Sequence, residues 1–264
     1  VGLAALVFLP FLRTRGQSPR TIVLYMLVGA MQLGIMYLLA FRAYLYLTVS
    51  EFLLFTVFTP LYITLIYDLL SGRKLRWGYL LSAALAVLGA AIIRYDKVSD
   101  HFWTGLLLVQ LSNLCFAIGM VGYKRLMEVR PMPQHNAFAW FYVGAFIVAV
   151  AAWFMLGNPQ KLPTTTLQWS VLVWLGVVAS GLGYFMWNYG ATQVDAGTLG
   201  IMNNVHVPAG LLVNLAIWQE QPHWPSFISG ALVILASLWV HRRWVAPHSG
   251  QTADDRRRGS AQSE

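Results

Sequence analysis

The sequence predicts an all-α polytopic membrane protein built from an inverted repeat of two five-helix halves. Three observations support this fold class. Of the 264 residues, 58% are hydrophobic and only 11% are charged, whereas a water-soluble domain carries about 25% charged residues. Apolar segments of about 20 residues, the length that crosses a bilayer, follow one another along the chain. The chain also matches itself when it is shifted by 148 residues.

The apolar segments define the expected membrane spans. They cover residues 21–41, 48–70, 76–94, 103–123, 137–156, 167–190, 197–218 and 224–241. The first thirteen residues are apolar but too short to span a bilayer. We therefore expect them to be the second half of a helix, with the chain beginning inside the protein and its first whole helix missing. The polar, basic tail 243–264 is expected to be disordered and cytoplasmic.

Lysine and arginine are concentrated in alternate loops, which predicts the orientation in the membrane. The rich loops contain Arg13/Arg15/Arg20, Arg73/Lys74/Arg76, Lys124/Arg125/Arg130 and Arg242/Arg243. Cytoplasmic loops carry an excess of these residues, so we place the rich loops and the C-terminus in the cytoplasm. The same distribution accounts for the net charge of +8 without a nucleic-acid partner.

The shift of 148 residues indicates an internal repeat. It places Ala43 on Ala191, Pro60 on Pro208, Ala83 on Ala231 and Arg94 on Arg242. We divide the chain into a first repeat, 1–94, which lacks its first helix and the start of its second, and a second repeat, 103–242. Halves with an odd number of spans insert in opposite orientations, and inverted repeats of this kind are typical of transporters that bind substrate between the repeats near the bilayer midplane.

Polar residues interrupt the span that contains the second of these prolines. Asn203, Asn204 and His206 precede Pro208 in an otherwise apolar segment. Polar groups at that depth are costly and usually face a protein interior or a wet cavity. Proline removes a backbone donor, so Pro208 and its counterpart Pro60 are predicted helix kinks. The alternative to a cavity wall is a kink whose amides bond to adjacent helices.

The equivalent face of the first half is aromatic. Glu51, Phe55, Phe58 and Tyr62 fall on one face of a helix, and the offset maps them onto Leu199, Asn203, His206 and Gly210. Facing each other, the two surfaces would form a slot with a stacking wall and a hydrogen-bonding wall, which suits an amphipathic ligand. The alternative is that Phe55 and Phe58 are ordinary packing residues.

Several stretches connect the chain to a known family. The proline-bearing helices are each followed by a helix of small residues, LSAALAVLGAAII and ISGALVILASLWV. This pattern resembles the EamA branch of the drug/metabolite transporter superfamily, whose fold has ten helices. The stretches FRAYLYLTVSE, VQLSN, MVGYKRLME, RPMPQHNAFAWFY and YGATQVDAGTLGIMNN are similar to the enterobacterial biotin-uptake carriers of that branch. The resemblance implies import of biotin across the bacterial inner membrane.

Biotin has a planar ureido group, an apolar ring and a carboxylate, and the candidate residues match these parts. The amides of Asn203 and Asn204 can donate to and accept from a ureido group, and an aromatic face can cover the ring. His206 or Arg42 could meet the carboxylate, although Arg42 could instead snorkel or pair with Glu51. Glu51 is the candidate proton-coupling site, or a structural partner of Arg42.

The span 103–123 adds two further candidates, Gln110 and Asn113, which share a helix face and could line the cavity or join helices. From the residues alone, a carrier or exporter of amino acids or other small metabolites stays open, and a channel or receptor is a weaker alternative. The histidines show no metal-ligand spacing and no nucleophile motif is present. We therefore expect that the protein is not an enzyme and that it binds no metal or cofactor. We expect a monomer or homodimer whose partners are its substrate and membrane lipid.

Overall fold

The computed structural model describes residues 1–47, 49–72, 102–205, 208–209 and 224–240, together with 77, 81, 84–85, 88, 212–213, 215–216 and 243. His206 and almost all of the predicted tail lie outside the described residues. Every described element is a helix. The α-helices are α1 (Gly2–Phe8), α2 (Pro19–Gly29), α3 (Met36–Ala43), α4 (Val49–Thr56), α5 (Thr59–Leu70), α7 (Phe102–Val129), α8 (Gln134–Leu156), α9 (Thr166–Trp174), α10 (Tyr184–Ala191), α11 (Ala196–Asn203) and α13 (Trp224–Val240).

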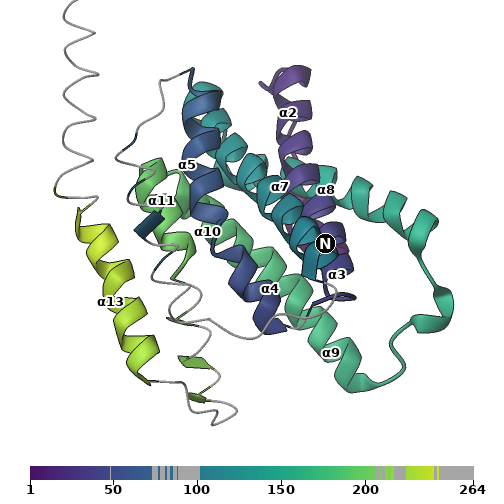
Figure 1. Cartoon of the computed structure of the whole chain (residues 1–264). Coiled ribbons are helices and arrows are strands. Elements are labelled where there is room, and N and C mark those ends of the chain that lie inside the picture. The colour runs from purple at the N-terminus through teal and green to yellow at the C-terminus, as the bar shows by residue number, and fades with distance from the viewer. Residues whose placement is uncertain are drawn as a thin grey trace, which may run out of the picture. The chain divides into compact units, whose positions relative to one another are not determined.

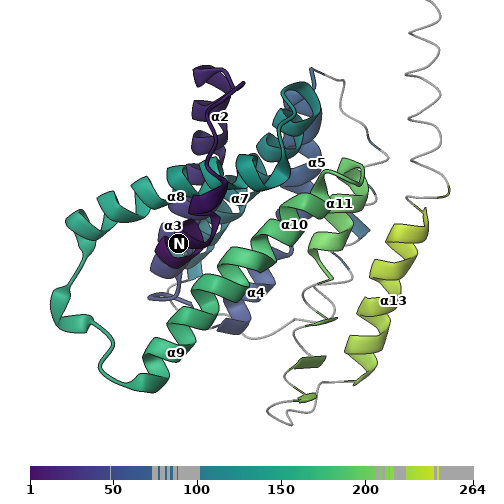
Figure 2. The same cartoon turned by 180° about the vertical axis from the view of Figure 1, so that it is seen from behind.

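Among the described residues, the remaining elements are two short 3₁₀ segments and two π-helical segments. The 3₁₀ segments are η1 (Leu9–Phe11) and η3 (Pro159–Lys161). The π-helical segment η2 (Ala30–Ile35) joins α2 to α3, and η4 (Leu175–Gly183) joins α9 to α10. Figure 2 shows α9, η4 and α10 as one continuous green helix.

Four described helices are long and apolar enough to cross a membrane, judged by length and composition. They are Pro19–Ala43, Trp103–Val129, Gln134–Leu156 and Thr166–Ala191. These helices confirm the spans predicted at 21–41, 103–123, 137–156 and 167–190, each extended by a few residues. The largest extension carries α7 through Lys124 and Arg125, which we had placed in a loop. Glu128 pairs with both cations one helical turn away, at 3.3 Å from Lys124, and these bonds favour a longer helix.

The chain divides into two compact units, and each unit takes helices from both predicted repeats. The first contains Val1–Thr48 and Ser99–Val194, and the second contains Val49–Val98 and Asp195–Glu264. In the first unit, α8 packs on α2 and η2, while α7 packs on α3 and η2. In the second unit, α11 lies beside α5 and also contacts α13, which is yellow in Figure 1. The compact units therefore do not coincide with the repeats at 1–94 and 103–242, and the division into these repeats stays a prediction.

Helix boundaries recur at the offset that the sequence suggested. Adding 148 to the bounds of α3 gives 184 and 191, which are the bounds of α10. The same shift places η2 on the last six residues of η4, so a π-helical segment immediately precedes both helices. π-Helical segments are rare, and their recurrence at equivalent positions supports the internal repeat.

Small residues bring α2 and α8 into close contact in the first unit. A Cβ atom added to Gly29 would lie 1.8 Å from the carbonyl oxygen of Phe141, and one added to Gly144 would lie 1.8 Å from that of Met26. Both approaches are shorter than any real carbon–oxygen contact. Small residues at helix crossings allow this kind of backbone packing in membranes, where dispersion contacts stabilise helix association.

A Gly29→Ala substitution is therefore expected to lower the free energy of unfolding by about 1–3 kcal/mol, because the added methyl group has to displace backbone atoms. Unfolding of purified protein in mixed detergent micelles measures this change. Gly190→Ala in α10 is the matched control, since nothing lies within 4 Å of its Cβ position. We expect the control to be as stable as the wild type or slightly more stable. An unchanged unfolding free energy in Gly29→Ala would contradict the close crossing.

Candidate functional site

The helix predicted to kink at Pro60 is broken at this position in the structure. α4 ends at Thr56 and α5 begins at Thr59. Pro60 has no backbone N–H to donate, so the carbonyl of Thr56 lacks its usual helical partner. The hydroxyl of Thr59 donates to that carbonyl instead, at 2.7 Å. The backbone N–H of Leu61 donates to the carbonyl of Phe58 at 3.0 Å, which leaves the intervening carbonyl of Val57 for another donor.

Asn204 supplies that donor from the other proline-bearing segment. α11 ends at Asn203, and Asn204 follows directly as its C-cap. The Asn204 Nδ2 atom donates to the Val57 carbonyl at 3.1 Å, in a fully buried position. The alternative that we left open, an amide bonded to an adjacent helix, thus holds for this nitrogen. Among the described residues, however, the buried Oδ1 atom of Asn204 has no hydrogen-bond partner.

Close packing fixes the position of Asn204. A Cβ atom added to Gly200 of α11 would lie 3.2 Å from the carbonyl oxygen of Pro60. Val57, at the break, also packs with Ile201 of α11 and Ile234 of α13 in one buried cluster. The sequence places a small residue and an aliphatic residue one turn before the amide, and these let α11 approach the break. The Asn204 side chain is therefore held between two interrupted helices.

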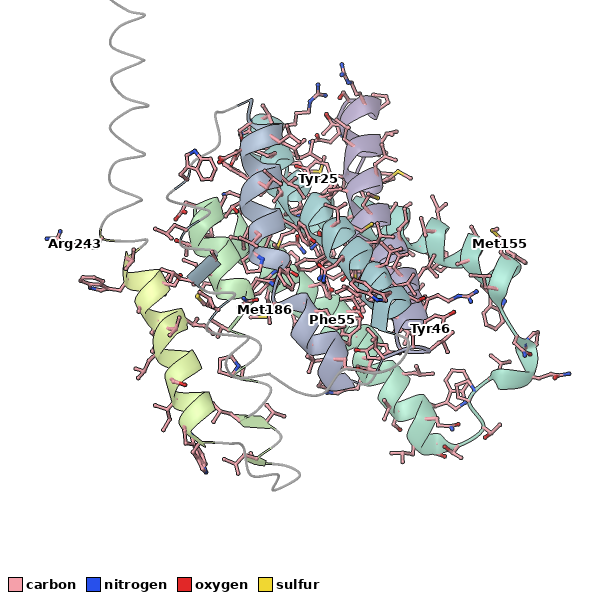
Figure 3. All side chains as sticks on the ribbon, viewed as in Figure 1. Tyr25, Tyr46, Phe55, Met155, Met186 and Arg243 are labelled. Carbon is pink, nitrogen blue, oxygen red and sulfur yellow. The ribbon has the colours of Figure 1, made fainter. Side chains whose placement is uncertain are left out.

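The aromatic candidates in the same unit differ in exposure. Phe55, labelled on α4 in Figure 3, is buried, and Tyr62 is half-buried. Phe58, at the break, is 41% exposed. Glu51 lies in the first turn of α4 with only 3% of its surface exposed, and Asn203 is 9% exposed. The predicted slot between these residues and His206 stays a prediction, because His206 is outside the described residues.

The other three candidates belong to the first unit. Asn113 Nδ2 donates to Gln110 Oε1 at 3.4 Å, which confirms that these two amides share a face of α7. Arg42 is exposed in the last turn of α3.

Pro208 belongs to the second unit. It is half-buried in a short described helical segment beyond the end of α11, so the end of α11, like the end of α4, is followed by a proline.

Two buried polar groups in the first unit were missed by the sequence reasoning. Gln32 in η2 has no exposed surface, and within the described part of the chain neither of its amide atoms has a hydrogen-bond partner. Lys124 is also buried, and its Nζ donates to the carbonyl of Val194 at 2.7 Å. A polar residue in the middle of a span was the available signal for Gln32, and it is the same signal that selected Asn203 and Asn204.

The residues near the end of α10 differ in their contacts and exposure. Trp187 Nε1 contacts the sulfur of Met120 at 3.0 Å, and Asn188 is fully buried, donating to the Tyr184 carbonyl at 3.0 Å. Tyr189 is 48% exposed. In the residues that the structure describes, no three His, Cys, Asp or Glu side chains form a group that could hold a metal ion.

Comparison with known proteins identifies the family. A model described as the EamA-like transporter family matches residues 103–242. The "Biotin transporter" of Escherichia coli (strain K12) is 83% identical over 264 residues, covering 100% of this chain and 88% of that protein. The "Probable biotin transporter" of Pseudomonas aeruginosa is 53% identical over 242 residues, covering 91% of this chain and 84% of that protein.

A solved crystal structure supports the same fold. It matches with a TM-score of 0.73 over 93% of this chain and 85% of that chain, at 18% sequence identity. Identity this low shows likeness of fold alone, whereas the family match and the identities above establish relationship. The chain belongs to the EamA-like transporter family, and it is a multi-pass inner-membrane transporter and not an enzyme.

Proposed function

We propose that this chain is a secondary carrier that imports biotin across the bacterial inner membrane. The observation that carries the proposal is the 83% identity, over the whole chain, to a protein named as a biotin transporter. The relative in Pseudomonas aeruginosa, at 53% identity, is named in the same way. Repeated helix boundaries and paired proline breaks fit a carrier, since broken helices in equivalent positions are typical of substrate sites in secondary transporters.

One group of the substrate contacts that we propose lies in the second unit, at the break before Pro60. Asn204 has one amide atom engaged by the Val57 carbonyl and a buried acceptor, Oδ1, left for an N–H donor. A ureido group supplies such donors. Asn203 and His206 form the rest of the polar wall. Phe55, Phe58 and Tyr62 form the aromatic wall that covers the ring of the ligand, and Phe58 has the exposure that stacking requires.

The proposed contacts in the first unit are Arg42, Gln110 and Asn113, whereas the proton-coupling candidate Glu51 belongs to the second unit. Arg42 binds the carboxylate of biotin, because its guanidinium is exposed and has two parallel donors for a carboxylate. Gln110 and Asn113 contribute polar contacts from α7. Glu51 couples transport to protons. Binding of biotin and of its methyl ester to the purified full-length protein tests the carboxylate contact. We expect the ester to bind at least about tenfold more weakly, and equal binding would remove Arg42 from the site.

Replacing Asn203 or His206 by alanine is expected to raise the half-saturating concentration of biotin about tenfold or more. Each substitution removes a hydrogen bond to a buried ligand, which is worth about 1–3 kcal/mol. The yield of each purified variant should be similar to that of the wild type. Binding isotherms on the purified variants measure the effect. Wild-type affinity in both variants would remove this segment from the site, and a loss of yield with unchanged affinity would indicate a structural role.

We also propose that the C-terminus faces the cytoplasm and that the protein works as a monomer or homodimer surrounded by membrane lipid. The orientation follows from the excess of Lys and Arg in the loops that share the side of Arg242 and Arg243. A green fluorescent protein fused behind residue 264 should fluoresce, since it folds on the cytoplasmic side. A fusion that does not fluoresce, together with an active alkaline phosphatase fusion at the same position, would show that the C-terminus faces the periplasm.

A further inference from the structure

Gln32 is a fully buried amide in the middle of the Pro19–Ala43 helix. Its side chain has 0% exposed surface, and neither Nε2 nor Oε1 has a hydrogen-bond partner among the residues that the structure describes. Burying an amide without partners is unfavourable, and most buried polar side chains in proteins are paired. An apolar residue of the same length would avoid that cost. The presence of glutamine here calls for a group that it binds.

The backbone around Gln32 holds this amide in a defined place. Gln32 lies in the π-helical segment η2, where the N–H of Met36 donates to the carbonyl of Met31, five residues back. A Cβ atom added to Gly119 of α7 would lie 2.3 Å from the Gln32 Cβ and 2.8 Å from its Cα. Because Gly119 has no side chain, the main chain at Gln32 can pack directly against α7. Short π-helical segments inside longer helices occur frequently at functional sites.

The equivalent position in the second half shows what a purely structural polar group looks like. The offset of 148 residues places Gln32 on Ser180, which lies in the other π-helical segment, η4. Ser180 is also buried, but its hydroxyl lies 3.3 Å from that of Tyr37, and its carbonyl accepts a hydrogen bond from Tyr142. Among the described residues, the polar side chain thus has hydrogen-bond partners in the second half (Ser180) and none in the first half (Gln32).

We propose that the Gln32 carboxamide binds the transported molecule, through a group in which an N–H lies beside a C=O, as in an amide or a urea. A carboxamide offers one donor and one acceptor side by side and can make two parallel hydrogen bonds to such a group. This inference rests on the proposed function, because biotin carries a urea. Full burial is compatible with the role, since a carrier exposes its binding groups in some conformations and closes them in others.

The test uses Gln32→Met, which keeps the length of the side chain and removes both polar atoms. We expect the half-saturating concentration of biotin for the full-length protein to rise at least about tenfold, while the melting temperature without biotin stays the same or rises. That combination separates a ligand contact from a packing residue, because removing an unpaired buried amide relieves a cost in the free protein.

Ser112→Ala is the matched control on the same helix pair. The Ser112 hydroxyl is buried and donates to the Met36 carbonyl at 3.1 Å, one turn from Gln32. Its removal should lower the melting temperature and leave biotin affinity within about twofold of wild type. Gln32→Asn, which keeps the amide but shortens its reach, should bind more tightly than Gln32→Met.

Three results would overturn the proposal. Wild-type affinity for biotin in Gln32→Met would exclude the contact between Gln32 and the ligand, but it would not contradict the proposed import of biotin. Loss of folded protein in both Gln32 variants would assign the residue to packing. A wild-type protein that binds no biotin would overturn the proposed function together with this inference, and the wild-type measurement therefore distinguishes the two failures.

Discussion

A Glu51→Gln substitution is expected to abolish accumulation of biotin against its gradient while sparing exchange of biotin across the membrane. Glu51 lies in the first turn of α4, and only 3% of its surface is exposed to solvent. A carboxyl group at such a position is costly to charge, so intramembrane acids usually have a functional or pairing role. Glutamine preserves shape but cannot exchange a proton, so coupling is lost and binding is kept.

Proteoliposomes measure both activities of the Glu51 variant. Uptake driven by an imposed pH gradient reports accumulation, and counterflow of labelled against unlabelled biotin reports exchange. Glu128→Gln is the control, because Glu128 lies near the end of α7, where it pairs with Lys124 and Arg125. The control should accumulate biotin normally. An unchanged pH dependence in Glu51→Gln would show that Glu51 is only structural.

Asn204→Ala is expected to reduce both stability and affinity. It removes the donor to the Val57 carbonyl at a break where the proline has already removed one backbone donor. A buried carbonyl left unpaired costs about 1–3 kcal/mol, so the free energy of unfolding should fall by about that amount. Loss of the Oδ1 acceptor should raise the half-saturating biotin concentration about tenfold or more.

Thr59→Val separates the two effects of Asn204→Ala. Valine has nearly the same shape as threonine but removes the hydroxyl that donates to the Thr56 carbonyl at 2.7 Å, at the same helix break. We expect a similar loss of stability with unchanged affinity. Unfolding in detergent and equilibrium binding on each variant measure the two quantities. Equal affinity in Asn204→Ala and wild type would limit Asn204 to joining the helices.

Features that depend on local sequence were predictable. Apolar segments located the four long helices within a few residues, because a bilayer sets a minimum length for a crossing helix. Pro60 marked the break between α4 and α5, since proline cannot donate the helical hydrogen bond. The pair Pro60 and Pro208 also gave the offset that relates α3 to α10.

Features that depend on contacts between distant segments were not predictable. Nothing in the local sequence distinguishes Asn204, whose Nδ2 bonds to the Val57 carbonyl, from Gln32, whose amide atoms have no hydrogen-bond partner in the described part of the chain. The buried position of Lys124 arises from an acceptor 70 residues away, the carbonyl of Val194. Likewise, the grouping of helices from both repeats into each compact unit follows from packing, which a repeat in the sequence does not reveal.

The most direct test of biotin import is uptake of radiolabelled biotin by bacteria that lack their own biotin uptake and express the full-length protein. We expect uptake well above that of an empty vector, suppressed by excess unlabelled biotin and unaffected by an equal excess of amino acids. Uptake no higher than that of the empty vector, or uptake suppressed by amino acids and not by biotin, would contradict the proposed function.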